Sequence, residues 1–401
     1  MKRILAAILA LSILFSSSPI NAATLYTPIK FEKQSETPSK DPLSLATPSA
    51  ILMEASTGTI LYEKNSHERL RPASITKIMT MILIFEALEN GAIAKEDIVT
   101  VSDHAAHMGG SQVYLETGEQ QTVNDLLKCI SIASANDACV AMAEFISGSE
   151  EAFVQKMNEK AAALGMQDTT FVNCCGLEAD GHLTSAHDIA LMSQELINKH
   201  PDVFNYCQIW MDTIYHTTRK GTSEFGLTNT NKLLRYYSYT NGLKTGYTSQ
   251  SKYCISATAC KDDLQLIAVV MAEESPKIRN KEAVALLNYG FANCTAYVDP
   301  NTDALPDAIV HHGTSETVPV AYKSAFTHMI TNGADISSIT KDIVMNDNIQ
   351  APLKAGDTIG IAVYFLNETQ LGTVDIICTE DVDILTVPIA YKSLFLQYLL
   401  K

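Results

Sequence analysis

Apolar residues recur at helical spacing in the segment that follows Pro72. The residues on this apolar face are Ile78, Met79, Ile82, Phe85 and Leu88. Recurrence every three or four residues predicts a helix that begins near Ser74 and ends at Asn90-Gly91. Two more such patterns, Thr122 to about Ile132 and Asp137 to about Ile146, predict a second and a third helix.

The next regular pattern is that of strands. The residues around Lys244 are strand-like, and apolar-rich stretches follow at 253–260 and 264–272, separated by the polar turn Lys261-Asp262-Asp263. This order predicts an antiparallel hairpin. From about Asn293 to Val387 the chain changes to short alternating stretches with Gly and Asp turns, which predict a small β-rich domain.

Strands at the start and the end of the region from about Pro48 to Phe291 bracket a mostly helical middle. We therefore predict an α/β (α+β) fold, with one antiparallel sheet built from both ends of the region, helices on its faces and a helical insertion. A small all-β domain follows. We expect a cleft between the sheet and the insertion.

The chain begins with Met1-Lys2-Arg3, about twelve apolar residues, and small residues up to Ala22-Ala23, as secretory signal peptides do. The polar stretch that follows has no periodicity and predicts a flexible lead-in. The predicted organisation is a signal peptide at 1–23, the lead-in at 24–45, the main domain at 46–292, the β-rich domain at 293–386 and a terminal helix at 387–401. We expect an exported protein.

The terminal helix is amphipathic, with a polar stripe of Ser393, Gln397 and Lys401 on an otherwise apolar surface. It is too short to span a bilayer of about 30 Å. We expect it to lie in the membrane interface, on the outer face of the cytoplasmic membrane. The alternative is that it folds back onto the β-rich domain.

Three short motifs occur in order: Ser74-Ile75-Thr76-Lys77, Ser134-Ala135-Asn136 and Lys244-Thr245-Gly246. At the start of a helix, Lys77 lies one turn from Ser74 and can take its proton, provided that burial or a second cation such as Lys244 lowers the lysine pKa. The helix start also presents the backbone N–H of Ser74 to a developing oxyanion.

The other two motifs supply binding groups. From a loop between helices, Ser134 can relay a proton to a leaving amine and Asn136 can hold a peptide group. On a strand, Lys244 and Thr245 can bind a carboxylate, while Gly246 leaves room for a substrate backbone. The Ser-x-x-Lys pattern also occurs at Ser249–Lys252 and at Ser338–Lys341. We interpret Ser338 as part of a surface turn, because no apolar helical run follows it.

The chain resembles the low-molecular-mass penicillin-binding proteins that act as serine-type D-alanyl-D-alanine carboxypeptidases. The resemblance covers about residues 45 to 385. It rests on the three motifs and their flanks, namely Ala55–Glu63, Pro72–Thr80, Gly110–Val113, Leu126-Leu127, Ser134–Ala138, Gly242–Thr248, Leu286–Phe291 and Gln350–Asp357. It implies the penicillin-recognising acyltransferase fold, removal of the terminal D-alanine of the peptidoglycan stem peptide, and inhibition by β-lactams.

The resemblance also implies roles for individual residues. Ser74 would be acylated with Lys77 as its base, and Ser134 and Asn136 would line the cleft. Lys244 and Thr245 would bind the terminal carboxylate, and the backbone N–H groups of Ser74 and Tyr247 would form the oxyanion hole. Arg279 falls where the family keeps an arginine near the carboxylate; its alternative is a solvated arginine that caps a helix. No metal or other cofactor is expected.

The formal net charge of −16, more negative still without Lys2 and Arg3, argues against a nucleic-acid-binding function. Nine cysteines in irregular spacing do not form a disulfide framework, and we expect several to be small apolar residues. His311 and His312 have no metal-binding partners nearby in the sequence and should be exposed.

Three other functions share these motifs. A class A β-lactamase needs a glutamate that positions water, and Glu144, Glu150, Glu151, Glu159 and Glu178 all lack the Glu-x-x-x-Asn setting of those enzymes. A D,D-endopeptidase needs only a more open cleft. A non-catalytic cell-wall-binding protein would not need the intact pair of Ser74 and Lys77.

Overall fold

The structure is a computed structural model that describes residues 41–219, 221–331, 334–389, 391 and 395. The predicted signal peptide, the part of the lead-in before residue 41 and most of the terminal helix lie outside the described residues. The predicted domain boundaries stay predictions.

The main domain is built on one antiparallel sheet of five strands in the order β2-β1-β9-β8-β7. Its first strand pairs with strands from the end of the domain, with Ile51 opposite Val269. The prediction of one sheet made from both ends is therefore confirmed. The strands are β1 (Ser49–Glu54), β2 (Ile60–Lys64), β7 (Thr240–Thr248), β8 (Lys252–Lys261) and β9 (Leu264–Glu273).

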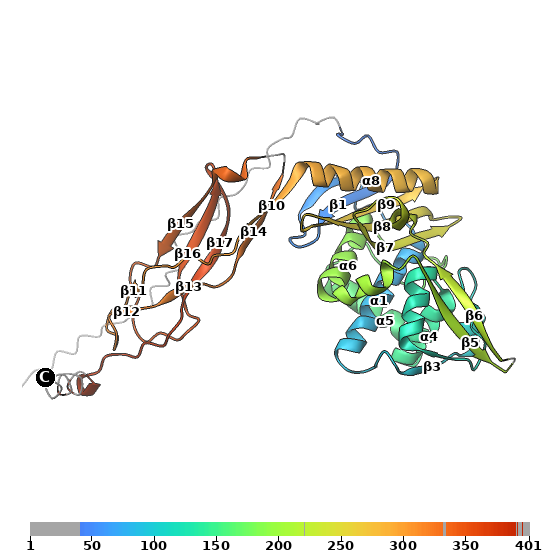
Figure 1. The fold of residues 1–401 in the computed structure, drawn as a ribbon, viewed down its shortest axis with the longest axis horizontal. Helices are drawn as coiled ribbons and strands as arrows, with labels where there is room; N and C mark the ends of the chain where they lie inside the picture. The colour runs from blue at the N-terminus through green and yellow to red at the C-terminus, as the bar shows by residue number, and fades with distance from the viewer. Residues whose placement is uncertain (1–40, 220, 332–333, 390, 392–394, 396–401) are drawn as a thin grey trace, which may run out of the picture. The chain divides into compact units, whose positions relative to one another are not determined.

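Helices cover both faces of this sheet (Figure 1). Because side chains alternate along a strand, Ile51 and Met53 enter the core shared with the helical insertion, while Leu52 points to α8 (Pro276–Asn293) on the opposite face. Gly290 lets α8 approach closely, since a Cβ there would lie 2.6 Å from Leu266 Cδ1.

The predicted helices of the insertion are confirmed, with one difference. A 3₁₀ turn at Ala73–Thr76 leads into α1 (Lys77–Glu89), and α4 (Asn136–Ser147) is the third predicted helix. The second ends early, because α3 (Val123–Lys128) passes into a π turn at Cys129–Ala133. The remaining elements are α2 (Asp103–Ala106), α5 (Glu150–Ala163), α6 (Ala186–Lys199), α7 (Phe204–Cys207), β3 (Ile98–Thr100), β4 (Gln120–Thr122), β5 (Met211–Thr218) and β6 (Gly221–Thr228), with 3₁₀ turns at Pro201–Val203 and Lys232–Arg235.

The C-terminal part is a β domain, as predicted. Its largest sheet has four strands in the order β13-β17-β16-β15. One of the domain's core clusters contains Tyr364, which stacks on Phe326 with ring centroids 3.7 Å apart. The strands are β10 (Cys294–Asp299), β11 (Ala308–Ile309), β12 (Thr317–Val318), β13 (Val320–Tyr322), β14 (Phe326–Thr331), β15 (Ile339–Met345), β16 (Thr358–Leu366) and β17 (Thr369–Cys378).

The repeated Ser-x-x-Lys motif lies in this β domain. Ser338 ends a 3₁₀ turn at Ile336–Ser338, and Lys341 forms an ion pair with Asp299 at 2.8 Å. The interpretation of Ser338 as part of a turn is confirmed. His311 and His312 are exposed, as expected.

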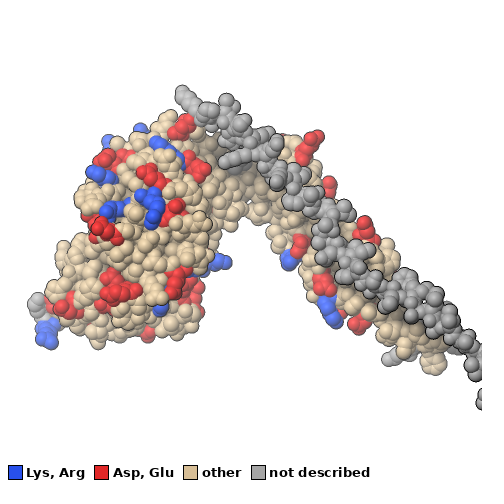
Figure 2. All heavy atoms as spheres, turned by 180° about the vertical axis from the view of Figure 1, so that it is seen from behind, with Lys and Arg blue, Asp and Glu red and all other residues tan. Residues whose placement is uncertain are grey.

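All nine cysteines are free thiols and eight are buried, the exposed one being Cys260, which confirms their interpretation as mainly core residues. On the face shown in Figure 2, acidic and basic side chains are interspersed. Within the described part of the chain, no helix has the length and apolarity needed to cross a membrane.

Candidate active site

The fold brings the three sequence motifs together. Lys77 Nζ lies 3.0 Å from Ser74 Oγ and 2.6 Å from Asn136 Oδ1, and Lys244 Nζ lies 2.9 Å from Ser134 Oγ. Of these groups, Ser74 and Ser134 line a pocket of about 590 Å³. Of the residues named from the sequence, the pocket is lined by Ser74, Ser134, Thr245, Gly246, Tyr247 and Arg279.

The three hydrogen-bond partners of Lys77 are uncharged. Its Nζ is fully buried and reaches the Asn136 amide oxygen, the Cys175 carbonyl oxygen at 2.7 Å, and the Ser74 hydroxyl. The first two groups only accept hydrogen bonds, whereas a hydroxyl can also donate. A neutral amine would therefore give its two N–H groups to the acceptors and turn its lone pair toward Ser74 Oγ. This is the arrangement that a general base for Ser74 requires.

Ser134 is held by a second buried lysine. The π turn ends at Ser134, which takes the left-handed backbone conformation with φ 62° and turns its hydroxyl toward Lys244. Lys244 Nζ also donates to the carbonyl of Thr245. Burial, together with the charge of Lys77, holds the pKa of Lys244 well below its usual value.

Asn136 and Lys244 lie behind the pocket wall. Both polar atoms of the Asn136 side chain have partners inside the protein, since Nδ2 donates to the Gly109 carbonyl at 2.7 Å. The observed contact of Asn136 is thus with Lys77, whereas the sequence analysis assigned it to a substrate peptide group. Lys244 contacts Ser134 instead of facing the pocket, and Thr245 next to it lines the wall.

Arg279 places a positive charge in the pocket wall. It is 5% exposed, so it is not the solvated capping arginine of the alternative interpretation. Its guanidinium donates to Asn280 Oδ1 and to the Cys254 carbonyl, and burial lowers its pKa. No carboxylate within the described residues forms an ion pair with Arg279. A buried cation with neutral partners favours an anionic ligand.

Gly246 lets strand β7 approach the nucleophile turn. A Cβ at this position would lie 2.8 Å from the Pro72 carbonyl and 3.1 Å from the Ser74 nitrogen. The requirement for glycine therefore comes from packing inside the protein, in addition to the space for substrate that the sequence suggested. Tyr247 follows at the pocket edge, 55% exposed and stacked on Tyr253. The backbones of Ser74 and the Gly246-Tyr247 segment thus adjoin.

One segment of the site was missed in the sequence. The loop Asn173–Leu177 supplies the Cys175 carbonyl to Lys77, and Gly176 packs against the nucleophile turn with φ +90°. A Cβ on Gly176 would lie 1.9 Å from the Ala73 carbonyl oxygen. The only local signal is the Asn-to-Gly spacing of a turn, in which Asn173 Oδ1 accepts from the Gly176 N–H at 2.7 Å.

Comparison with known proteins agrees with this geometry. Residues 34–275 match the peptidase S11 family, described as D-alanyl-D-alanine carboxypeptidase, and residues 303–383 match the C-terminal domain of penicillin-binding protein 5. The chain belongs to the D-alanyl-D-alanine carboxypeptidase family. The predicted family, the predicted fold class and the prediction of a serine-type hydrolase are confirmed.

Members of this family align over most of the chain. The D-alanyl-D-alanine carboxypeptidase DacF of Bacillus subtilis is 41% identical over 357 residues, which are 89% of this chain and 90% of the relative. DacC of Escherichia coli is 33% identical over 375 residues, 90% of this chain and 89% of the relative. The crystal structure of penicillin-binding protein 5 from Haemophilus influenzae superposes with a TM-score of 0.75 at 30% identity, covering 86% of this chain and 100% of that chain.

Replacing Gly176 by Ala tests the missed loop. We expect Gly176→Ala to lower the free energy of unfolding by well over 2 kcal/mol and to slow acylation of Ser74, because the new methyl group overlaps the Ala73 carbonyl. The matched control is Gly181→Ala, which has φ +82° but no atom within 4 Å of the new Cβ. It should cost only about 1–2 kcal/mol, from backbone strain. Urea unfolding and fluorescent-penicillin labelling measure both effects, and equal values for the two variants would contradict the assignment.

Proposed function

We propose that this chain is a serine D-alanyl-D-alanine carboxypeptidase that removes the terminal D-alanine from the peptidoglycan pentapeptide through an acyl-enzyme on Ser74. The observation that carries the proposal is the pairing of Ser74 with Lys77 at 3.0 Å beside a pocket that contains an arginine without an acidic partner in the described structure. A nucleophile, its base and a site for the terminal carboxylate therefore lie together.

Acylation uses the two serine–lysine pairs. Ser74 Oγ attacks the carbonyl carbon of the penultimate D-alanine while Lys77 Nζ takes the hydroxyl proton. The peptide bond then breaks, and the leaving amine of the terminal D-alanine receives that proton from Lys77 through Ser134, which Lys244 holds at 2.9 Å. Water later hydrolyses the ester on Ser74 and regenerates the hydroxyl.

Two sets of groups orient the substrate, one at the oxyanion and one at the terminal carboxylate. The carbonyl oxygen accepts hydrogen bonds from the backbone N–H groups of Ser74 and Tyr247, which would stabilise the oxyanion of the tetrahedral intermediate. The terminal carboxylate binds Thr245 and Arg279 in the pocket wall, and Lys244 lies behind them. Asn136 orients Lys77 through the contact at 2.6 Å. β-Lactams acylate Ser74 by opening their strained amide ring.

The alternatives lack comparable support. None of the glutamates considered for a class A β-lactamase lines the pocket: Glu150 accepts from the Cys174 N–H and Glu178 from the Gln250 N–H. A D,D-endopeptidase remains a second candidate, since the same site would cleave a cross-link that reaches the pocket. The proximity of Ser74 and Lys77 disfavours a non-catalytic cell-wall-binding protein.

We also propose that the protein is exported by its signal peptide and lies on the outer face of the cytoplasmic membrane through its terminal helix. The described residues of that segment, 387–389, 391 and 395, are helical. The apolar side chains of Val387, Ile389, Tyr391 and Phe395 are exposed, as an interfacial helix requires. We keep the boundaries 46–292 and 293–386 for the two folded domains as part of this proposal.

Acylation of Ser74 is tested by fluorescent penicillin and by D-alanine release from a pentapeptide. Ser74→Ala should abolish labelling and reduce D-alanine release by roughly a thousandfold or more, because the nucleophile is lost. The control is Ser338→Ala, which alters the second copy of the same tetrapeptide in the β domain and should leave both measurements unchanged. A penicillin adduct on the peptide that carries Ser338, found by mass spectrometry, would disprove the assignment.

Recognition of the terminal carboxylate is tested with a peptide acid and its amide. We expect the wild type to prefer the acid, and Arg279→Ala to lower kcat/KM for the acid by roughly 10- to 100-fold through loss of a charge-assisted contact. Turnover of the amide should barely change. Lys277→Ala is the control, since this exposed lysine lines the same pocket two residues away. Equal turnover of acid and amide by the wild type would count against the role.

Truncation before Val387 tests the membrane anchor. The shortened protein should move from the membrane fraction to the soluble fraction and keep full D-alanine release, because the described active site lies between residues 74 and 279. Fractionation and the pentapeptide assay measure this. If the truncated enzyme still sediments with membranes, the anchor lies elsewhere, and if it unfolds, the segment belongs to the core.

A further inference from the structure

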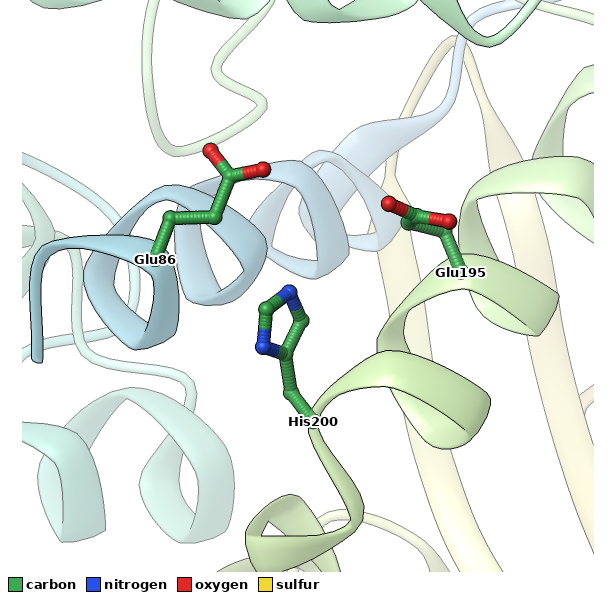
Figure 3. A group of neighbouring side chains, drawn as sticks. All are labelled: Glu86, Glu195 and His200. Atoms are coloured by element: carbon green, nitrogen blue, oxygen red, sulfur yellow. The ribbon is translucent and has the colours of Figure 1, made fainter. Parts of the chain in front are cut away.

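A second group of ionisable side chains lies at the C-terminal ends of α1 and α6. Glu86 comes from α1, Glu195 from α6, and His200 caps the end of α6. One ligand atom from each of the three lies within 4.8 Å of the others. Figure 3 shows the imidazole ring of His200 pointing into the gap between the two carboxylates.

His200 has one nitrogen with a partner and one without. The residue is 4% exposed, and its Nδ1 lies 2.7 Å from Glu89 Oε1. A carboxylate accepts, so Nδ1 donates to it, and in the neutral imidazole Nε2 then keeps a lone pair. Nε2 is buried and has no hydrogen-bond partner within the described structure. Figure 3 shows that this nitrogen faces the gap. This nitrogen has no partner and faces two carboxylates, so a cation held between them would give it one.

The negative electrostatic potential around this cluster also favours a bound cation. Glu86 and Glu195 lie near helix C-termini, where the backbone carbonyls already create negative potential, and α1 has no basic residue in its last turn. Lys160 of α5 contacts both carboxylates, at 2.8 Å from Glu86 and 2.7 Å from Glu195. Its ammonium does not satisfy His200 Nε2. The lysine therefore neutralises part of the negative charge of the cluster and leaves His200 Nε2 without a partner.

We propose that Glu86, Glu195 and His200 bind a first-row divalent cation such as Mn²⁺ or Zn²⁺, which displaces the ammonium group of Lys160. One imidazole and two carboxylates form a donor set that these ions accept, and the imidazole disfavours Mg²⁺ and Ca²⁺. Glu89 would orient His200 through the Nδ1–H bond, the usual support of a histidine ligand.

The cluster is accessible to an ion from solvent. The Glu86 and Glu195 side chains are 35% and 19% exposed, and Glu195 also lines a cleft of about 240 Å³. The His200 ring is supported from within by Phe85, whose ring lies nearly parallel to it at 6.0 Å. A bound ion would join α1, which begins with Lys77, to α6, which packs on the sheet. Its expected effect is on stability, because the cluster lies outside the pocket at Ser74.

The proposal is tested by calorimetric titration of the full chain with Mn²⁺ and with Zn²⁺. The buffer contains a non-chelating phosphine reductant, which keeps the thiols reduced. We expect saturable binding of one ion and a rise in Tm, because binding to the folded state alone stabilises it. His200→Asn keeps an N–H that can reach Glu89 but removes Nε2, and should abolish both effects. Glu89→Gln should weaken binding by about 10- to 100-fold.

Lys160→Met gives the most informative result. Without the competing ammonium group, the site should bind the ion more tightly than the wild type, and the ion should restore the Tm that the substitution lowers. Lys156→Met, an exposed lysine on the same helix, is the matched control and should leave affinity and Tm unchanged. Fluorescent-penicillin labelling reports whether each variant is folded, independently of metal binding.

Two results would overturn the proposal. If neither the wild type nor Lys160→Met binds either ion at millimolar concentration, the two carboxylates serve only as ion-pair partners of Lys160. If binding persists unchanged in His200→Asn, the ion occupies another group, such as the exposed thiol of Cys260. Binding that is lost in His200→Asn and tighter in Lys160→Met would support the site.

Discussion

The active site depends on the hydrogen bonds of the buried Lys77 amine. Ser74, Asn136 and Cys175, from three separate parts of the chain, all have a polar atom within 3.0 Å of its nitrogen. Burial of a polar group costs free energy unless its hydrogen bonds are made, so these contacts require the turn, the helix and the loop to assemble together. The nucleophile is consequently positioned by tertiary structure and not by its own helix alone.

Close backbone approach is the second condition for this assembly. Gly246 of β7 and Gly176 of the Asn173–Leu177 loop both contact the turn at Ala73-Ser74, where a side chain would overlap backbone atoms. These glycines bring the sheet, the loop and the helical insertion to one point. The distances between the nucleophile, its base and the pocket wall follow from this packing.

The site concentrates positive charge in an acidic protein. Lys77, Lys244 and Arg279 are all buried, and none of them has an ion-pair partner among the described residues, although the chain carries a formal charge of −16. The repulsion between Lys77 and Lys244 is part of what lowers the pKa of Lys244. The same excess of charge favours an anionic substrate. The C-terminal end of helix α1 is acidic instead. There Glu86 pairs with Lys160, and Glu89 contacts His200.

The sequence by itself determined the helices, the hairpin, the β domain and the family, because hydrophobic periodicity and short motifs are local properties of the chain. It also named Ser74, Lys77, Ser134 and Lys244 and paired Ser74 with Lys77. Tertiary structure decided what each group contacts: Asn136 binds Lys77, Lys244 binds Ser134, and the Cys175 carbonyl completes the site. The cluster at His200 was likewise not predicted, since Glu86 lies more than 100 positions before Glu195 and His200. Contacts between distant segments depend on packing and burial, which no local pattern records.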